Sequence, residues 1–309
     1  MLLLSVPISV ADRGGLSVGE LDELAIDGLS LGPYLSAEQQ KQLADDLRKS
    51  GQLCLEVAHP MNGGRRPLPD PLSADRDERR AALQVLNATI ERAARHNAER
   101  VVLYPSRVTL HQSVGLLSQR FAEGRTLNFA PLFEQRAALS EPMLDRLLKL
   151  LDGALRAAER VGLTIALPGP APWPHNFPRQ AEVALLLDEF AGGPLEATFF
   201  SDWQTIARRL GTDDQFWTDT PAARLSAACG LTSGLPPSWA EPTVVPSAER
   251  ITLYLRIAVS LEEARTVVEA VRERLAQRPA EPQTDTNQQT NQQDEPHFVK
   301  SPSGLLLPY

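Results

Sequence analysis

The feature that most constrains how this chain folds is a regular alternation between two kinds of segment. Short runs rich in Val, Leu and Ile alternate with longer segments in which apolar residues recur at three- and four-residue steps. This pattern is typical of repeated strand–helix–strand units, in which buried parallel strands are covered by amphipathic helices. Eight runs are predicted as strands: Leu2–Val10, Leu24–Leu31, Leu53–Ala58, Arg100–Tyr104, Leu163–Leu167, Leu195–Phe200, Leu225–Gly230 and Ile251–Ile257.

The length of the chain fits one barrel followed by a tail. The chain has 309 residues, and (β/α)₈ barrels run to roughly 250 residues as a single unit. From about Arg278, polar residues and proline replace the apolar residues until Phe298, so this segment is unable to form a core. We therefore predict an α/β protein with a (β/α)₈ TIM barrel over residues 1–278. Residues 279–309 are predicted to be a polar, low-complexity, disordered tail, whose apolar end at Leu305–Leu307 is suited to dock on the barrel or a partner.

Two segments between the strands carry apolar stripes that predict helices packed on the sheet. The stripes are Ala82, Leu83, Leu86, Ile90, Ala93 and Ala94, and Leu144, Leu147, Leu148, Leu151, Leu155 and Ala158. By contrast, Ser106–Ser140 is a long excursion after the fourth strand. Because the loops that follow barrel strands lie on the ligand-binding face, this excursion is predicted to be a lid.

Composition narrows the range of partners. A net charge of -8 without a basic stripe argues against nucleic acid, whose binding depends on clustered Lys and Arg. The opening apolar run is too short for a signal peptide, and no stretch approaches the 18 or so apolar residues that cross a bilayer. The two cysteines, Cys54 and Cys229, lie inside predicted strands and are interpreted as buried free thiols. We expect a cytoplasmic protein with no membrane and no nucleic-acid partner.

Several sequence segments along the chain resemble one family of barrels. They are Leu53–Pro60, Asp75–Ser106, Leu150–Gly211 and Ile251–Arg265. In their order and amino-acid sequence these segments resemble the xylose isomerase-like TIM barrel family, which includes sugar-phosphate isomerases, epimerases and the endonuclease IV group. The resemblance covers roughly residues 1–278 and implies a divalent metal held at the carboxyl ends of the strands. In the family that metal polarises a sugar carbonyl or hydroxyl while carboxylates move the proton.

The resemblance also shows where this chain departs from the family's metal ligands. The fifth strand of the family usually ends in a Leu-Glu-Asn type phrase, whereas Leu167 is followed here by Pro168 and Gly169. After the sixth strand Asp202 remains, but Thr205 occupies the position of the family's histidine. The other ligand positions of the fourth, seventh and eighth strands fall at Tyr104, within Ser226–Cys229, and near Tyr254.

A single carboxylate is unable to hold a catalytic divalent ion, because such an ion needs several anionic or nitrogen ligands to replace its water shell. We therefore expect a degenerate member of the family, with no metal site and no cofactor. A divalent metal is expected only if the chain is an active enzyme.

A few polar residues remain where the mouth of the barrel is predicted. A ligand-lining set is predicted at His59, Tyr104, Arg107, His111, Trp173 and His175, suited to a small sugar-like or phosphorylated ligand. His59 precedes a proline in a turn and fits a hydrogen-bonded structural role as well as that of a base. Asp202 fits the cap of a following helix, and Arg256 fits either a salt bridge or contact with an anionic ligand.

Three functional hypotheses follow. The first is a pseudoenzyme that binds a small ligand or a protein partner through the former active-site mouth. The second is an active sugar (phosphate) isomerase or epimerase that draws its acid and base from His59, Tyr104, Asp202 and Arg256. The third is a scaffold that recruits a partner through its C-terminal tail.

Overall fold

The computed structural model describes most of the barrel and small parts of the remaining chain. The described residues are 2–6, 20, 23–24, 26–31, 38, 41–42, 45–46, 49, 54–59, 68–169, 173–200, 225–231, 251–255, 260–276, 299–300 and 306–307. Residue contacts divide the chain into two compact units, 1–275 and 276–309. Within the described part, no helix has the length and apolar character to cross a membrane.

The first unit is built on a closed parallel barrel. Its strands are β1 (Leu2–Val6), β2 (Gly28–Leu31), β3 (Cys54–Ala58), β4 (Arg100–Val102), β6 (Thr164–Gly169), β8 (Leu195–Phe200), β9 (Leu225–Leu231) and β10 (Ile251–Leu255). They pair in the order β1-β10-β9-β8-β6-β4-β3-β2, and β1 closes the ring against β2. The predicted (β/α)₈ barrel is therefore confirmed, with each strand inside or overlapping its predicted run.

The ends of some strands differ from the prediction. β8 has the predicted bounds, whereas β4 ends at Val102 and the chain turns out of the sheet before Tyr104. β2 begins only at Gly28, because Leu24 lies in a bend before it. β6 runs two residues further, through Pro168 and Gly169, where it pairs with β8.

Side chains on each strand alternate between the outside and the inside of the barrel. The outward residues, such as Leu29, Val57, Ile165, Leu167 and Leu253, are fully buried. They belong to one hydrophobic cluster that also contains the apolar faces of the covering helices. This layer between sheet and helices is the main core of the protein.

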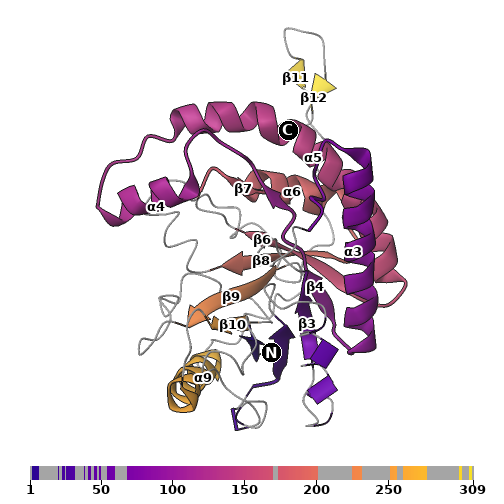
Figure 1. Cartoon of the computed structure of the whole chain (residues 1–309), viewed down its shortest axis with the longest axis vertical. Helices are drawn as coiled ribbons and strands as arrows, with labels where there is room; N and C mark the ends of the chain where they lie inside the picture. The colour runs from indigo at the N-terminus through magenta and orange to yellow at the C-terminus, as the bar shows by residue number, and fades with distance from the viewer. Residues whose placement is uncertain are drawn as a thin grey trace. The chain divides into compact units, whose positions relative to one another are not determined.

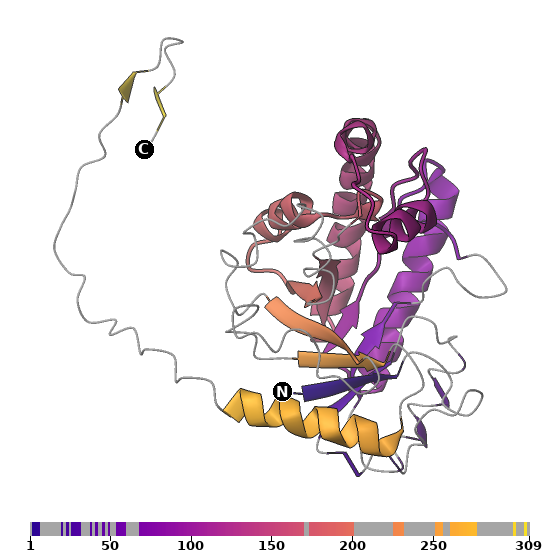
Figure 2. The same cartoon turned by 90° about the vertical axis from the view of Figure 1, so that its left-hand side faces the viewer.

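The helices that cover the barrel follow the predicted stripes. α3 (Arg76–Arg95) packs against β3, β4 and α5 (Ala130–Glu159), while α6 (Gln180–Glu189) packs against β6 and β8. α9 (Leu261–Ala276) lies beside β1 and β10 in both views (Figures 1 and 2).

The starts of two of these helices have a local cause. Asp75 caps α3 by accepting a hydrogen bond from the backbone N–H of Asp77. Two ion pairs, Arg265 with Glu23 and Arg272 with Asp27, connect α9 to the segment before β2. Ser260 directly precedes α9, and its carbonyl accepts a hydrogen bond from the backbone N–H of Ala264.

The excursion after the fourth strand is more helical than predicted. It contains the short β5 (Ser106–Arg107), α4 (Val114–Ala122) and the first turns of α5, which begins at Ala130 and continues through Pro142. The helix persists across the proline because Leu132, Arg136 and Ser140, spaced four residues apart, are all buried. In Figure 1, α4 lies on the side toward which the arrowheads of β8 and β9 point, which is the carboxyl-end face of the barrel.

The second unit contains one described feature. β11 (Val299–Lys300) pairs antiparallel with β12 (Leu306–Leu307). The apolar end that the sequence singled out therefore forms a two-residue strand pair with Val299 and Lys300. The predicted disorder of residues 279–309 concerns segments that lie mainly outside the described residues, and it stays a prediction.

Candidate functional site

Charged side chains fill the part of the barrel interior that lies near the amino ends of the strands. Arg100, the first residue of β4, contacts Glu56 of β3, Glu196 of β8 and Thr252 of β10. Because β4 and β10 are not neighbours in the barrel, a contact between them has to cross its interior. The side chain of Arg100 is fully buried, and that of Glu56 is 5% exposed.

The hydrogen bonds of this cluster are short. Arg100 Nε donates to Glu56 Oε2 at 2.5 Å, and Arg100 Nη1 donates to Glu196 Oε2 at 3.2 Å. Ser30 Oγ of β2 donates to the other oxygen of Glu56, also at 2.5 Å. Two carboxylates thus surround one guanidinium near the amino ends of the strands, where side chains serve stability and not catalysis. The sequence analysis did not single out these residues, although a charge within an apolar strand is a signal for such a cluster.

Nearer the carboxyl ends of the strands, small apolar side chains line part of the interior. Ala58 and Val102, each two residues beyond a member of the charged cluster, pack together with Ala166 of β6. Tyr104 lies half-buried against these three residues. The structure therefore places Tyr104 at the mouth of the barrel, as the sequence analysis predicted.

The end of the fifth barrel strand, β6, is occupied by a proline. Ala166 faces the interior whereas Ile165 and Leu167 face the helices, so alternation turns Pro168 inward as well. Pro168 is buried, and it pairs in register with the buried Thr198 of β8. A pyrrolidine ring carries no atom that binds a metal. Within the described part of the chain, no three His, Cys, Asp or Glu side chains are grouped closely enough to hold an ion.

Two loops at the mouth are joined by a short antiparallel ribbon. β5 pairs with β7 (Asn176–Phe177), Ser106 opposite Phe177 and Arg107 opposite Asn176. We call β5, β7 and the adjoining residues 108–112 and 173–175 the rim strap. It connects the loop after β4 to the loop after β6 on the carboxyl-end side of the barrel.

His175 joins the two halves of the rim strap. Its carbonyl accepts from the N–H of Val108 at 2.8 Å, and its ring Nε2 lies 2.5 Å from the carbonyl oxygen of Gln112. A carbonyl only accepts, so Nε2 carries the ring proton. Nδ1 of the same ring is buried and, within the part of the chain that the structure describes, has no hydrogen-bond partner. Burial, followed by the charges of Arg107 and His111, lowers the pKa of His175, and the bond to Gln112 offsets part of that effect.

A buried arginine holds the rim strap from α5. Arg136 donates from Nε to the carbonyl of Pro174 at 3.0 Å and from Nη2 to that of Asn176 at 3.2 Å. Its two Nη atoms also form a bidentate pair with Glu182 of α6 at 2.8 and 2.6 Å, and Nη1 reaches Ser140 Oγ at 3.2 Å. All five N–H donors of the guanidinium thus have acceptors. Neither Arg136 nor Glu182 was predicted as a site residue, because neither belongs to a recognisable sequence pattern.

Aromatic rings pack the excursion after β4 onto the rim strap. Trp173 lies edge-on to Phe121 of α4 and to Phe129 before α5, with ring centroids 6.0 and 6.5 Å apart. The guanidinium of Arg179 lies 4.5 Å from the centre of the Phe133 ring. Trp173 therefore contributes to apolar packing between the excursion and the rim strap, and its predicted role in stacking on a ligand stays a prediction.

His59 lies on the other side of the sheet from the barrel interior. It is buried, and its Nδ1 is 3.3 Å from Thr89 Oγ1 on α3. Burial and, to a smaller extent, the charge of Arg92 lower its pKa to about 4. The alternation of β3 explains this placement, since Glu56 and Ala58 point inward. The structure favours the hydrogen-bonded structural role that the sequence analysis weighed for this histidine.

The remaining predicted site residues divide into two groups. Arg107 and His111 are exposed on the rim strap, and His111 Nδ1 lies 2.6 Å from Gln135 Oε1. Asp202 and Arg256 lie outside the described residues, as does Thr205. The structure therefore brings Arg107, His111 and His175 together, places Tyr104 nearby at the mouth, and separates His59 from them.

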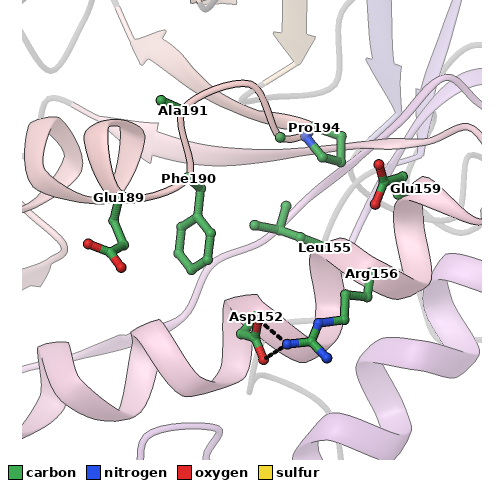
Figure 3. Close-up of a pocket in the computed structure, with 9 residues that line it drawn as sticks. Asp152, Leu155, Arg156, Glu159, Glu189, Phe190, Ala191 and Pro194 are labelled. Carbon is green, nitrogen blue, oxygen red and sulfur yellow. Dashed lines mark hydrogen bonds and ion pairs between the residues drawn. The ribbon is translucent and has the colours of Figure 1, made fainter.

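A surface cavity of about 250 Å³ lies at the opposite end of the barrel (Figure 3). It is lined by the last turns of α5 and by Phe190, Ala191, Gly193 and Pro194, which precede β8. Segments that precede strands lie at the amino-end face, away from the loops that form active sites in this architecture. The dashed lines in Figure 3 mark the ion pair between Asp152 and Arg156 at its edge.

Solved sugar epimerases share this architecture. A 3-keto-D-glucoside 4-epimerase from E. coli aligns over 89% of this chain and 98% of its own, with 9% identity and a TM-score of 0.59. A D-allulose 3-epimerase from Methylomonas sp. aligns over 88% of this chain and 97% of its own, with 9% identity and a TM-score of 0.59. The D-psicose 3-epimerase of Clostridium cellulolyticum H10, solved with D-tagatose, covers 87% and 89%, with 11% identity and a TM-score of 0.54.

This chain has the xylose isomerase-like TIM-barrel fold. No family model and no curated protein matches its sequence. At such low identities the xylose isomerase-like fold alone is shared, and fold does not determine function. The residues at the mouth of the barrel have to carry the functional argument.

Proposed function

We propose that this chain is a sugar phosphate isomerase/epimerase-like barrel that has lost the metal-dependent active site and acts by binding a small ligand or a protein partner. The observation that carries this proposal is the buried Pro168 at the inward end of β6. In the family that the sequence resembles, a carboxylate metal ligand follows the fifth strand.

The surroundings of Pro168 support the proposal further. The inward residues near this end of the described barrel include Ala58, Val102 and Ala166, which have no side-chain ligand atom, and Thr198, which pairs with Pro168 and offers a single hydroxyl. The charged cluster of the interior lies nearer the amino ends of the strands, where Arg100 is bonded to both Glu56 and Glu196. A divalent ion needs several oxygen or nitrogen ligands at one point, and the described residues of the mouth offer too few.

The polar groups around the mouth suit a neutral or anionic small molecule. Tyr104 offers a phenol and an aromatic face beside the interior, and the exposed Arg107 and His111 offer hydrogen-bond donors on the rim strap. Sugar hydroxyls and phosphate oxygens are bound by groups of these kinds. A sugar-like or phosphorylated compound is therefore the ligand class that we propose.

Calorimetric titration of the full-length protein with Mn²⁺, Co²⁺ and Zn²⁺ tests the loss of the metal site. We expect no stoichiometric binding by the wild type. Pro168→Glu is the matched variant, and we expect it to stay without metal because one restored carboxylate is not enough. Tight one-to-one binding of any of these ions by the wild type would overturn the proposal.

The alternative of an active isomerase has one supporting observation, which is the position of Tyr104 at the inner mouth. It is tested by incubating ketose and aldose phosphates with the protein in deuterated water, with and without metal. Enzymatic proton exchange at the carbon next to the carbonyl, abolished in Tyr104→Phe, would favour the alternative. Absence of exchange under both conditions supports a binding protein.

A further inference from the structure

The rim strap depends on a small number of polar contacts. Apart from the pairing of β5 with β7, its two halves are joined by the bond from Val108 to the carbonyl of His175 and by the bond from His175 Nε2 to the carbonyl of Gln112. Two of these contacts belong to one residue. The first uses the backbone carbonyl of His175 and the second uses its ring, so a change in the charge of the ring acts directly on the second.

The surroundings of the ring are suited to a neutral imidazole and not to a cation. Only 6% of His175 is exposed, and its Nδ1 has no hydrogen-bond partner among the described residues. In the neutral ring Nδ1 is an unpaired acceptor, whereas in the protonated ring it becomes an unpaired, charged donor. A buried charged donor without an acceptor costs more than a buried neutral acceptor.

The charged groups that face His175 do not compensate for a second proton. From the loop after β4, Arg107 and His111 both oppose a positive charge on the ring. From α5, Arg136 contacts the carbonyls of Pro174 and Asn176, and its own charge is paired with Glu182 of α6. No carboxylate among the described residues forms an ion pair with His175.

We propose that His175 is a proton-sensitive latch, which keeps the loops after β4 and β6 joined at the rim of the barrel when neutral and releases them when protonated. The two loops that it joins lie on the face where a ligand would enter, so release changes access to the mouth. This inference does not depend on whether the barrel binds metal or catalyses a reaction.

The direction of the pH dependence follows from linkage. The pKa of His175 is lower in the closed strap than its ordinary value of 6.5, so the closed form binds the proton less well than the open form. The contribution of the latch is fully present above pH 6.5 and is lost as pH falls through the lowered pKa. Between pH 6.5 and the lowered pKa of His175, the equilibrium constant for opening of the strap rises by up to about tenfold for each pH unit of decrease, because opening takes up one proton.

Hydrogen exchange of the full-length protein between pH 5 and 8, corrected for intrinsic rates, tests the latch. We expect amides of residues 106–112 and 173–178 to lose protection as pH falls, while those of β6 and α3 keep theirs. His175→Gln replaces the ring with an amide that still reaches Gln112 but does not titrate, and the pH dependence should disappear. His111→Gln, which removes the exposed imidazole of the same strap, should retain it.

Two results would overturn the latch: protection of the strap that does not change with pH, or an unchanged pH dependence in His175→Gln. If His175→Gln does not fold, nitrogen-labelled histidine NMR of the wild type decides the question. The latch requires a neutral ring with the proton on Nε2 and a pKa below 6.5. A proton on Nδ1, or a pKa at or above 6.5, excludes it.

Discussion

At the scale of single residues, the charges inside this barrel are engaged with each other. Arg100 has no exposed surface and bonds to carboxylates from two strands, so its donors are used within the protein. Breaking such a cluster from one side leaves uncompensated buried charge, which is costly even where the intact cluster adds little net stability.

Arg100→Met should therefore lower the free energy of unfolding by about 3–5 kcal/mol, because Glu56 and Glu196 lose their shared cation. Urea denaturation at neutral pH measures the change. The control is Arg156→Ala, which removes a 73% exposed partner of Asp152 and should change stability by less than about 0.5 kcal/mol. Combining Arg100→Met with Glu56→Gln and Glu196→Gln should recover part of the loss. Equal effects of the two single substitutions would show that the interior cluster is not the stabilising feature.

The sequence identified some residues of the mouth and missed others for physical reasons. Tyr104 follows a strand of the barrel in the sequence, and in the structure it packs against the small apolar residues of the interior, while its role in binding stays a prediction. His59 also follows a strand, but the alternation of β3 turns it toward α3. Arg136 was missed because its partners, Pro174, Asn176 and Glu182, lie about 40 residues away along the chain. Contacts at that separation leave no local pattern.

At the scale of elements, the barrel strands were predictable and the rim strap was not. A buried parallel strand needs a run of apolar residues, and all eight runs were visible. β5 and β7 have two residues each, too few to show alternation. Their position depends on tertiary contacts, among them those of Arg136 and His175.

Arg136→Lys should loosen the rim strap, because an ammonium keeps the charge but cannot form the fork that reaches Glu182 and two carbonyls at once. We expect a loss of about 1–3 kcal/mol of local stability, read from hydrogen exchange of residues 173–178. Arg146→Lys is the matched control, since it makes the same change on the same helix, where the guanidinium donates to the carbonyl of Leu72. Comparable exchange of the strap in both variants would contradict the role assigned to Arg136.

At the scale of the whole molecule, closure of the barrel explains why the fold was easier to predict than the function. Eight strands that alternate with helices have few ways to bury both faces of a parallel sheet, and a closed barrel is one of them. The mouth is less constrained, since loops tolerate changes that leave the core intact. Pro168 illustrates this point, because β6 keeps its register with β8 although the residue at its inward end is a proline.

Deleting the residues after Arg278 should leave the barrel intact, because the first compact unit ends at Leu275 and the core side chains of α9 precede that point. We expect the Tm of the shortened chain to stay within about 2 °C of the full-length value, which corresponds to about 1 kcal/mol or less for a chain of this size. A deletion that begins after Thr266 is the contrasting variant. It removes the buried Val267, Val268 and Val271, each worth about 1.5–3 kcal/mol, and should prevent stable folding. Size-exclusion chromatography with light scattering on the first variant also tests the tail-scaffold hypothesis. If the tail recruits a partner, the state of assembly should change when the tail is removed. If the barrel is a ligand-binding protein, the state of assembly should stay the same.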